Sequence, residues 1–134
     1  MLALLGVDDR LVGRSHECDH PPRLASLPIL TRQRTDPNAA PAEIDRQVSD
    51  AVAAGESLYE LDTPRLHELA PDLIVTQDLC DVCSIDLPAV QRAARELGER
   101  VGVEPRVVSL NPQTVEGVLD DILILADAVG EPAR

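Results

Sequence analysis

The clearest strand in the sequence is DLIVT at residues 72–76, a β-branched apolar run between Pro71 and the polar pair Gln77-Asp78. We expect this run to be a central strand. Strand-like and helical segments alternate on both sides of it, which is typical of crossover units in a mainly parallel sheet. The sequence therefore predicts an α/β fold in which helices cover both faces of that sheet.

The other elements follow from hydrophobic spacing and from turn formers. The expected strands cover residues 10–14, 27–31, 57–61 and 105–110. Residues 2–7 are expected to form the end of a helix, which is closed by Gly6 or the following aspartates. Four further helices are expected at residues 41–54, 64–69, 86–98 and 114–129. Gly55 is expected to close the helix at 41–54. Asp62 or Thr63 is expected to cap the helix at 64–69, and Asn111-Pro112 or Thr114 the helix at 114–129.

The composition excludes several classes of function. The 134-residue chain carries 24 acidic and 12 basic residues, a formal net charge of −12, which repels nucleic acid and anionic lipids. All the basic residues are arginine, so no lysine can form a Schiff base. Phe and Trp are absent and Tyr59 is the single tyrosine, so the core is expected to be aliphatic. One domain of ordinary size is expected.

The apolar segment at the start of the sequence bears on the cellular compartment in which the chain is expected. The apolar run at residues 1–7 has no basic residue before it and ends at Asp8-Asp9, which is unlike a signal peptide. No run approaches the roughly 20 apolar residues that a membrane span needs. As written, the chain is expected in the cytoplasm.

Cysteine and histidine gather in two short segments. Cys80 and Cys83 form a C-x-x-C pair after the predicted central strand, and His16 and Cys18 follow the predicted strand at 10–14. The carboxyl ends of parallel strands meet at one edge, so these four residues could form a zinc site. Two other interpretations stay open: a thiol redox pair at Cys80 and Cys83, or buried inert cysteines beside a solvated histidine loop.

Most other charged residues are expected to be exposed. His67 is interpreted as a surface histidine with no role. The acidic residues of the predicted helices are interpreted as solvated faces: Glu43, Asp45, Asp50, Asp120 and Asp121.

Three stretches together resemble a known family. They are RLVGRSHECDHPP at 10–22, SLY at 57–59 with PDLIVTQ at 71–77, and LCDVC at 79–83. They are similar to the amino-terminal lobe of the cobalamin and iron-siderophore substrate-binding proteins of ABC importers, which are usually periplasmic or extracytoplasmic. The resemblance runs from about residue 4 to residue 130. It implies a Rossmann-like three-layer lobe over residues 1–110 and the start of the long interlobe helix at 111–134.

The resemblance also implies a function. The chain would be a binding module, not an enzyme, and would need no cofactor beyond its ligand, a corrinoid or an iron-siderophore chelate delivered to an ABC permease. The residues expected to face that ligand are Ser15, His16, Glu17, Tyr59, Gln77 and Asp78. Glu60 or Asp62 is expected to dock on the permease.

The same comparison predicts that the chain begins after the family's first strand and ends before the second lobe. We expect a sheet edge left uncovered near Val12 or Ile74, which a second lobe or self-association would cover. The alternative function is a metal-binding or thiol redox protein that uses His16, Cys18, Cys80 and Cys83. A third possibility is a remnant with neither activity.

Overall fold

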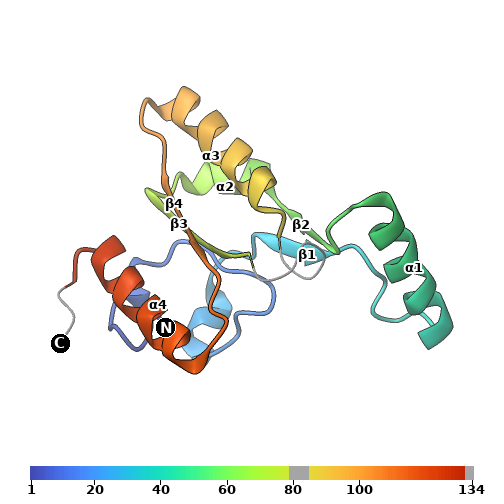
Figure 1. Ribbon diagram of the computed structural model, residues 1–134. Coiled ribbons are helices and arrows are strands. Elements are labelled where there is room, and N and C mark those ends of the chain that lie inside the picture. The colour runs from blue at the N-terminus through green and yellow to red at the C-terminus, as the bar shows by residue number, and fades with distance from the viewer. Residues whose placement is uncertain (79–84, 132–134) are drawn as a thin grey trace.

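The computed structural model describes residues 1–78 and 85–131, and Figure 1 shows how its elements are arranged. Two 3₁₀ helices, Asp8–Arg10 and Pro22–Ser26, precede the first strand. The strands and longer helices follow in the order β1 (Thr31–Gln33), α1 (Pro41–Ala54), β2 (Tyr59–Leu61), α2 (Thr63–Leu69), β3 (Leu73–Gln77), α3 (Leu87–Val101), β4 (Arg106–Leu110) and α4 (Val115–Ala128).

The predicted α/β class is confirmed by the unit of β3, α3 and β4. The DLIVT run forms β3 and pairs in parallel with β4, from Leu73 opposite Arg106 to Gln77 opposite Leu110. A parallel pair needs a crossover connection, and α3 supplies it. The carboxyl ends of β3 and β4 therefore lie at the same edge.

The single, mainly parallel sheet that we predicted is not confirmed. The described residues form two two-stranded sheets, and the one made by β1 and β2 is antiparallel. β3 is therefore not flanked by strands on both sides, and its residues 73–76 are only half-buried. The uncovered edge predicted near Val12 or Ile74 is compatible with this pairing, since Val12 is exposed and β3 pairs only with β4 among the described residues.

The predicted strands at 10–14 and 27–31 are wrong as regular strands. Residues 8–10 form a 3₁₀ helix, and only Arg14 pairs with Ile29, in a single parallel bridge. Pro28 has no N–H to donate, and the turn formers between the two segments give them no long parallel run to share. Regular pairing starts at Thr31, where β1 meets β2.

The hydrophobic core lies on the two faces of the β3–β4 sheet. On one face Val108 and Leu110 pack with Leu125 of α4, and Leu2 and Leu5 of the first turn pack against them. On the other face lies α3, whose buried side chains are Val90, Ala93, Ala94 and Leu97. Figure 1 shows α3 and α4 on opposite sides of this sheet.

Several predicted helix ends are confirmed. Gly55 follows α1 with a φ of 68°, the left-handed conformation that glycine adopts most readily. The Thr114 side chain accepts a hydrogen bond from the Gly117 N–H at 3.0 Å and caps α4. α3 continues past Gly98, where we expected it to end, and closes at Gly102 instead.

Two residues predicted to be solvated are not. Asp121 of α4 is 5% exposed, because it lies on the face of the helix that packs against the rest of the fold. His67 of α2 is half-buried, with Nε2 3.1 Å from the Ala93 oxygen and Nδ1 2.9 Å from the Arg100 guanidinium. Nδ1 must accept from Arg100, so His67 donates to Ala93 through Nε2 and joins α2 to α3.

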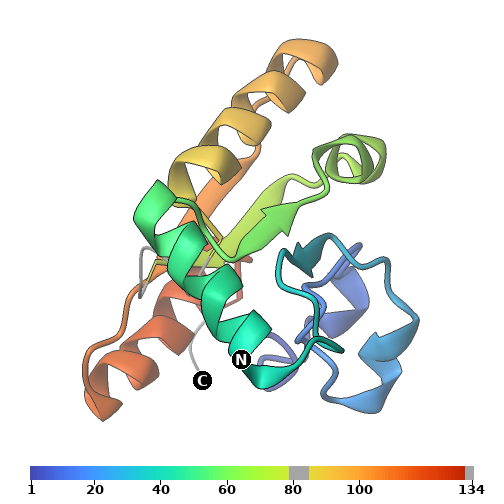
Figure 2. The same cartoon turned by 90° about the vertical axis from the view of Figure 1, so that its right-hand side faces the viewer.

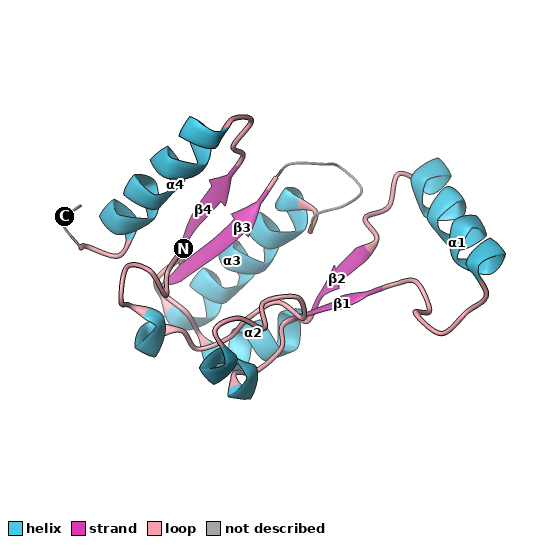
Figure 3. Ribbon diagram, turned by 90° about the horizontal axis from the view of Figure 1, so that it is seen from below, coloured by secondary structure: helices cyan, strands magenta, loops and turns pink. Residues whose placement is uncertain are grey.

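α1 lies apart from this core. It has no buried residue, although its apolar positions recur at helical spacing as the sequence predicted. Figures 1 and 3 show it at one end of the molecule, beyond β1 and β2. In Figure 2 the right-hand side of Figure 1 faces the viewer, so that α1 lies in front of the other elements.

Removal of the Asp62 cap is expected to destabilise the protein. Asp62 accepts a hydrogen bond from the Arg65 N–H at 3.0 Å and is the N-cap of α2. Asp62→Ala should lower the free energy of unfolding by about 1 kcal/mol, measured by urea denaturation. Asp62→Asn keeps an acceptor oxygen and should lose far less. If both variants lost the same free energy of unfolding, the capping hydrogen bond would not be the cause of the destabilisation.

Candidate functional site

The loop that follows Arg14 is held beside β1 by backbone hydrogen bonds. The Arg14 N–H donates to the Pro28 oxygen at 2.9 Å, and the Leu30 N–H donates to the Arg14 oxygen at 2.9 Å. A turn follows directly, in which the Cys18 N–H donates to the Ser15 oxygen at 3.2 Å. The single bridge at Arg14 therefore places residues 15–18 next to the start of β1.

His16 is anchored to Thr31 of β1 by two contacts. Its backbone N–H donates to Thr31 Oγ1 at 3.0 Å, and its ring Nδ1 lies 2.6 Å from the same oxygen. A hydroxyl can donate once and accept twice, so Thr31 satisfies either tautomer of the ring. The two contacts fix both the backbone and the imidazole orientation.

Tyr59 of β2 lies against the same imidazole. In the antiparallel register Thr31 is opposite Leu61 and Gln33 is opposite Tyr59, so Thr31 and Tyr59 share one face of the strand pair. The His16 and Tyr59 rings have centroids 5.3 Å apart and are tilted by 43°. Three segments distant in sequence thus meet, and we call this group the His16 cluster: Ser15, His16, Glu17, Cys18, Thr31 and Tyr59.

The second ring nitrogen of His16 is the least satisfied polar atom of the cluster. Nε2 is buried and makes no hydrogen bond with any described residue, while the side chain as a whole is 23% exposed. Glu17 Oε1 lies 3.9 Å from Nε2, beyond hydrogen-bond distance, and the Glu17 side chain is 69% exposed. A buried nitrogen without a partner is costly, and a ligand could satisfy it.

The thiol of the cluster is exposed. Cys18 Sγ lies 3.3 Å from Ser15 Oγ, which donates to it. The interpretation of Cys18 as a small buried apolar residue is therefore wrong. It lies in the turn closed by the hydrogen bond from its own N–H to the Ser15 oxygen.

The predicted ligand-facing residues separate into two groups. Ser15, His16, Glu17 and Tyr59 belong to the cluster. Gln77 ends β3 and is exposed, and the Asp78 N–H donates to the Leu110 oxygen at 3.1 Å. No hydrogen bond or ion pair joins either residue to the cluster within the described part of the chain.

The predicted zinc site falls partly outside the described residues. Cys80 and Cys83 lie in the segment 79–84, so their distances to His16 and Cys18 are not described. Among residues 1–78 and 85–131, no group of three or more His, Cys, Asp or Glu side chains is arranged to hold a metal ion.

The two residues expected to dock on a permease have partners within the fold. Glu60 lies opposite Arg32 in the β1–β2 register, and its carboxylate is 2.8 Å from that guanidinium. Asp62 is the N-cap of α2. Both side chains nevertheless line one groove of about 450 Å³, which also includes Thr31 of the His16 cluster.

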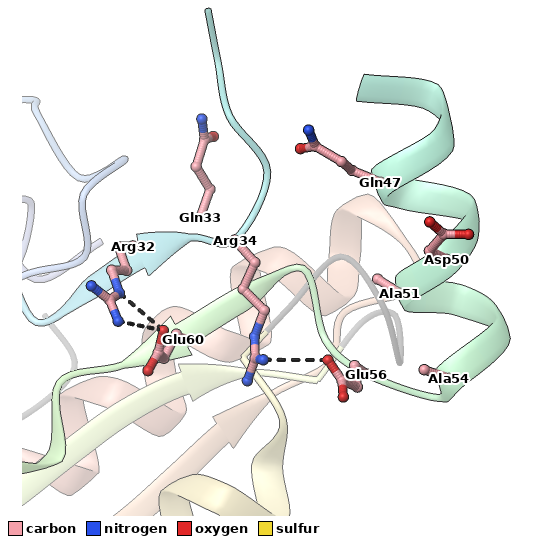
Figure 4. Close-up of a pocket in the computed structure, with 9 residues that line it drawn as sticks. All are labelled: Arg32, Gln33, Arg34, Gln47, Asp50, Ala51, Ala54, Glu56 and Glu60. Carbon is pink, nitrogen blue, oxygen red and sulfur yellow. Dashed lines mark hydrogen bonds and ion pairs between the residues drawn. The ribbon is translucent and has the colours of Figure 1, made fainter. Parts of the chain in front are cut away.

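A larger open groove of about 710 Å³ separates α1 from the strands, and Figure 4 shows its lining. Arg32 and Arg34 approach it from the strand side, and each is paired with a glutamate, Arg32 with Glu60 and Arg34 with Glu56 at 3.3 Å. The α1 wall contributes Gln47, Asp50, Ala51 and Ala54. Paired arginines on an acidic protein favour neither an anion nor a large apolar ligand in this groove.

The resolved pKa shifts belong to surface pairs away from the cluster. A hydrogen bond from Arg23 lowers the pKa of the Asp8 carboxyl, and the same contact raises the pKa of Arg23. A hydrogen bond from Arg46 lowers the pKa of Glu43 on α1. These exposed pairs stabilise little and do not mark a catalytic group.

Sequence reasoning missed Thr31 and Arg32. The sequence predicts Thr31 only as part of a strand, whereas in the structure it holds both the backbone and the ring of His16. Arg32 neutralises Glu60 across the strand pair. The alternation of side chains along β1 could have separated these two faces, but only the β1–β2 register decides which residues are opposite.

Comparison of the chain with known protein families, with curated proteins and with solved structures finds no match. Within the described residues, no helix combines the length and the apolar character needed to cross a membrane.

Proposed function

We propose that the chain is a lobe of a substrate-binding protein that captures cobalamin, a related corrinoid or an iron-siderophore chelate for an ABC permease. The support from the sequence is the resemblance of residues 10–22, 71–77 and 79–83 to that family. The observation that carries the proposal is His16, with one ring nitrogen anchored and the other buried without a described partner.

The anchored imidazole has the chemistry of a metal-directed ligand. Histidines that bind metals usually hold their other ring nitrogen in a hydrogen bond, which fixes the tautomer and the ring orientation. When Nδ1 donates to Thr31, the lone pair on Nε2 would be available to coordinate a corrinoid cobalt, whereas a siderophore chelate, whose iron is already saturated by its own oxygens, would be contacted through hydrogen bonds and packing. The Tyr59 ring beside it would offer an apolar face to a macrocycle.

Glu17 would control access to that nitrogen. Its carboxylate lies 3.9 Å from Nε2, and its side chain is 69% exposed. The proposal also includes the finer architecture. The β3–α3–β4 unit and the parallel Arg14–Ile29 bridge are compatible with a Rossmann-like lobe over residues 1–110, and α4 with the start of an interlobe helix.

Aquacobalamin, whose cobalt carries an exchangeable water, is expected to bind the full chain with a saturable shift of its visible spectrum. Displacement of that water by the His16 imidazole is the physical reason. His16→Gln should weaken binding by about tenfold or more, which corresponds to about 1.4 kcal/mol. His20→Gln changes an exposed histidine of the same loop and should bind as the wild type does. An unchanged spectrum, or equal binding by His16→Gln, would contradict the proposal for corrinoids.

Tyrosine fluorescence provides an independent measurement for iron chelates. Tyr59 is the only Phe, Tyr or Trp residue, so all of the intrinsic emission arises in the His16 cluster. A ferric hydroxamate siderophore that binds there should quench this emission in the wild type and less in His16→Gln. Quenching of equal strength in both proteins would place the chelate elsewhere.

The alternative function, metal binding or thiol redox chemistry, is favoured by one observation, the exposed Cys18 thiol beside Ser15 and His16. It predicts one zinc ion bound per chain and lost in Cys18→Ser, with no change in the aquacobalamin spectrum. That pair of results would replace the first proposal by the second.

A further inference from the structure

The outer face of α4 carries large apolar side chains that the fold does not cover. Val115, Leu119 and Leu123 are 75%, 58% and 53% exposed, and Val118 beside them is 39% exposed. Residues at i, i+4 and i+8 lie above one another on a helix, so the first three form one continuous ridge. We call these four side chains the α4 ridge. Figure 3 shows α4 at the periphery of the molecule, beside β4.

The opposite face of the same helix is buried although it contains a charged residue. Asp121 is packed inward next to Leu125, and its Oδ2 has no hydrogen-bond partner among the described residues. An aspartate inside and a leucine ridge outside reverse the usual distribution of polarity on a surface helix. Contiguous exposed apolar side chains of this kind mark interaction sites on soluble proteins.

The charges on α4 indicate what kind of surface covers the ridge. The helix contains four acidic residues and no basic one. Glu116 and Asp120 are exposed beside the ridge and form no ion pair with any described residue, whereas Asp127 lies 3.7 Å from Arg106. A second α4 would place like charges against these carboxylates, and anionic lipids would be repelled in the same way.

We propose that the α4 ridge docks an amphipathic helix of another protein, whose apolar stripe is flanked by lysine or arginine. A ridge of side chains spaced four residues apart fits into the groove between the corresponding rows of a second helix. Basic flanks on the partner would pair with Glu116 and Asp120. The interaction is independent of any ligand at the His16 cluster, so either proposal can fail without the other.

The test uses the full chain and a synthetic amphipathic peptide of about 18 residues, roughly five helical turns. The basic peptide has leucines on one stripe and lysines at the flanks. A second peptide keeps the leucines and has glutamates at the flanks, and a third keeps the lysines and has serines in the stripe. We expect the first to bind about tenfold or more tighter than either of the others, measured by fluorescence anisotropy with a labelled peptide. Equal binding of the serine peptide would reduce the interaction to non-specific charge attraction and overturn the proposal.

Variants of the chain locate the binding surface. Leu119→Ser with Leu123→Ser should weaken binding of the basic peptide by about tenfold, while Val103→Ser, at a 73% exposed apolar residue outside α4, should leave it unchanged. An unchanged urea midpoint in each variant confirms that folding is intact. A wild-type dimer that the double variant dissociates would overturn the proposal in favour of a second copy of the chain.

Discussion

Leu125→Ala is expected to lower the free energy of unfolding by about 2–5 kcal/mol, the range for a leucine removed from a packed core. Leu125 is 1% exposed and contacts Val108 and Leu110 of β4 from the inner face of α4. The loss combines the missing transfer free energy with the cavity that remains. It would remove a large part of the stability of a domain of this size.

The matched control lies two residues earlier on the same helix. Leu123→Ala makes the same chemical change at a side chain that is 53% exposed, and should cost less than about 0.5 kcal/mol. Urea denaturation followed by circular dichroism measures both. If Leu125→Ala does not fold, Leu125→Val provides a smaller truncation at the same position. Equal losses at the two positions would mean that the other face of α4 is also covered.

Gly98→Ala should destabilise the protein by about 1–3 kcal/mol, the usual range for an overpacked site. Gly98 lies within α3, where alanine would normally be favoured over glycine by about 1 kcal/mol. A Cβ atom at this position would lie 2.7 Å from Glu104 Cα and 3.0 Å from Glu104 N, too close for van der Waals contact. Because backbone atoms cannot rotate away as a side chain does, the chain after α3 must move.

Gly117→Ala is the control for Gly98→Ala. It has the same change within α4, and the nearest atom to its Cβ would be Thr114 Oγ1 at an ordinary 3.4 Å. This variant should be neutral or more stable by up to about 1 kcal/mol, since only the helix propensity changes. Thermal and urea denaturation should therefore give opposite signs for the two variants. A stabilised Gly98→Ala would contradict the close approach of residue 104 to α3.

Some residues of the expected ligand site could be predicted before the structure was known, and one could not. The family resemblance implied that His16, Glu17 and Tyr59 face one ligand, and the structure places Glu17 and Tyr59 beside His16. The sequence did not identify Thr31, whose contact with His16 spans 15 residues and depends on the Arg14–Ile29 bridge. A residue that acts by positioning another carries no signal of its own type or spacing.

Elements whose causes lie within a few residues could be predicted from the amino-acid sequence. The β-branched run of β3 and the left-handed Gly55 follow from neighbouring side chains and backbone sterics. For α2 and α4 the same local rules left two candidate caps each, of which the structure selects Asp62 and Thr114. These local interactions operate in the same way wherever the element is placed.

The faces and edges that those elements bury could not be predicted in this way, because they depend on long-range packing. The division into two small sheets, the burial of Asp121 and the exposure of the α4 ridge depend on contacts between distant segments. α4 is apolar around most of its circumference, so its pattern allowed several orientations. In the structure Leu125 packs against Val108 and Leu110 of β4, and this orientation leaves Leu119 and Leu123 in solvent.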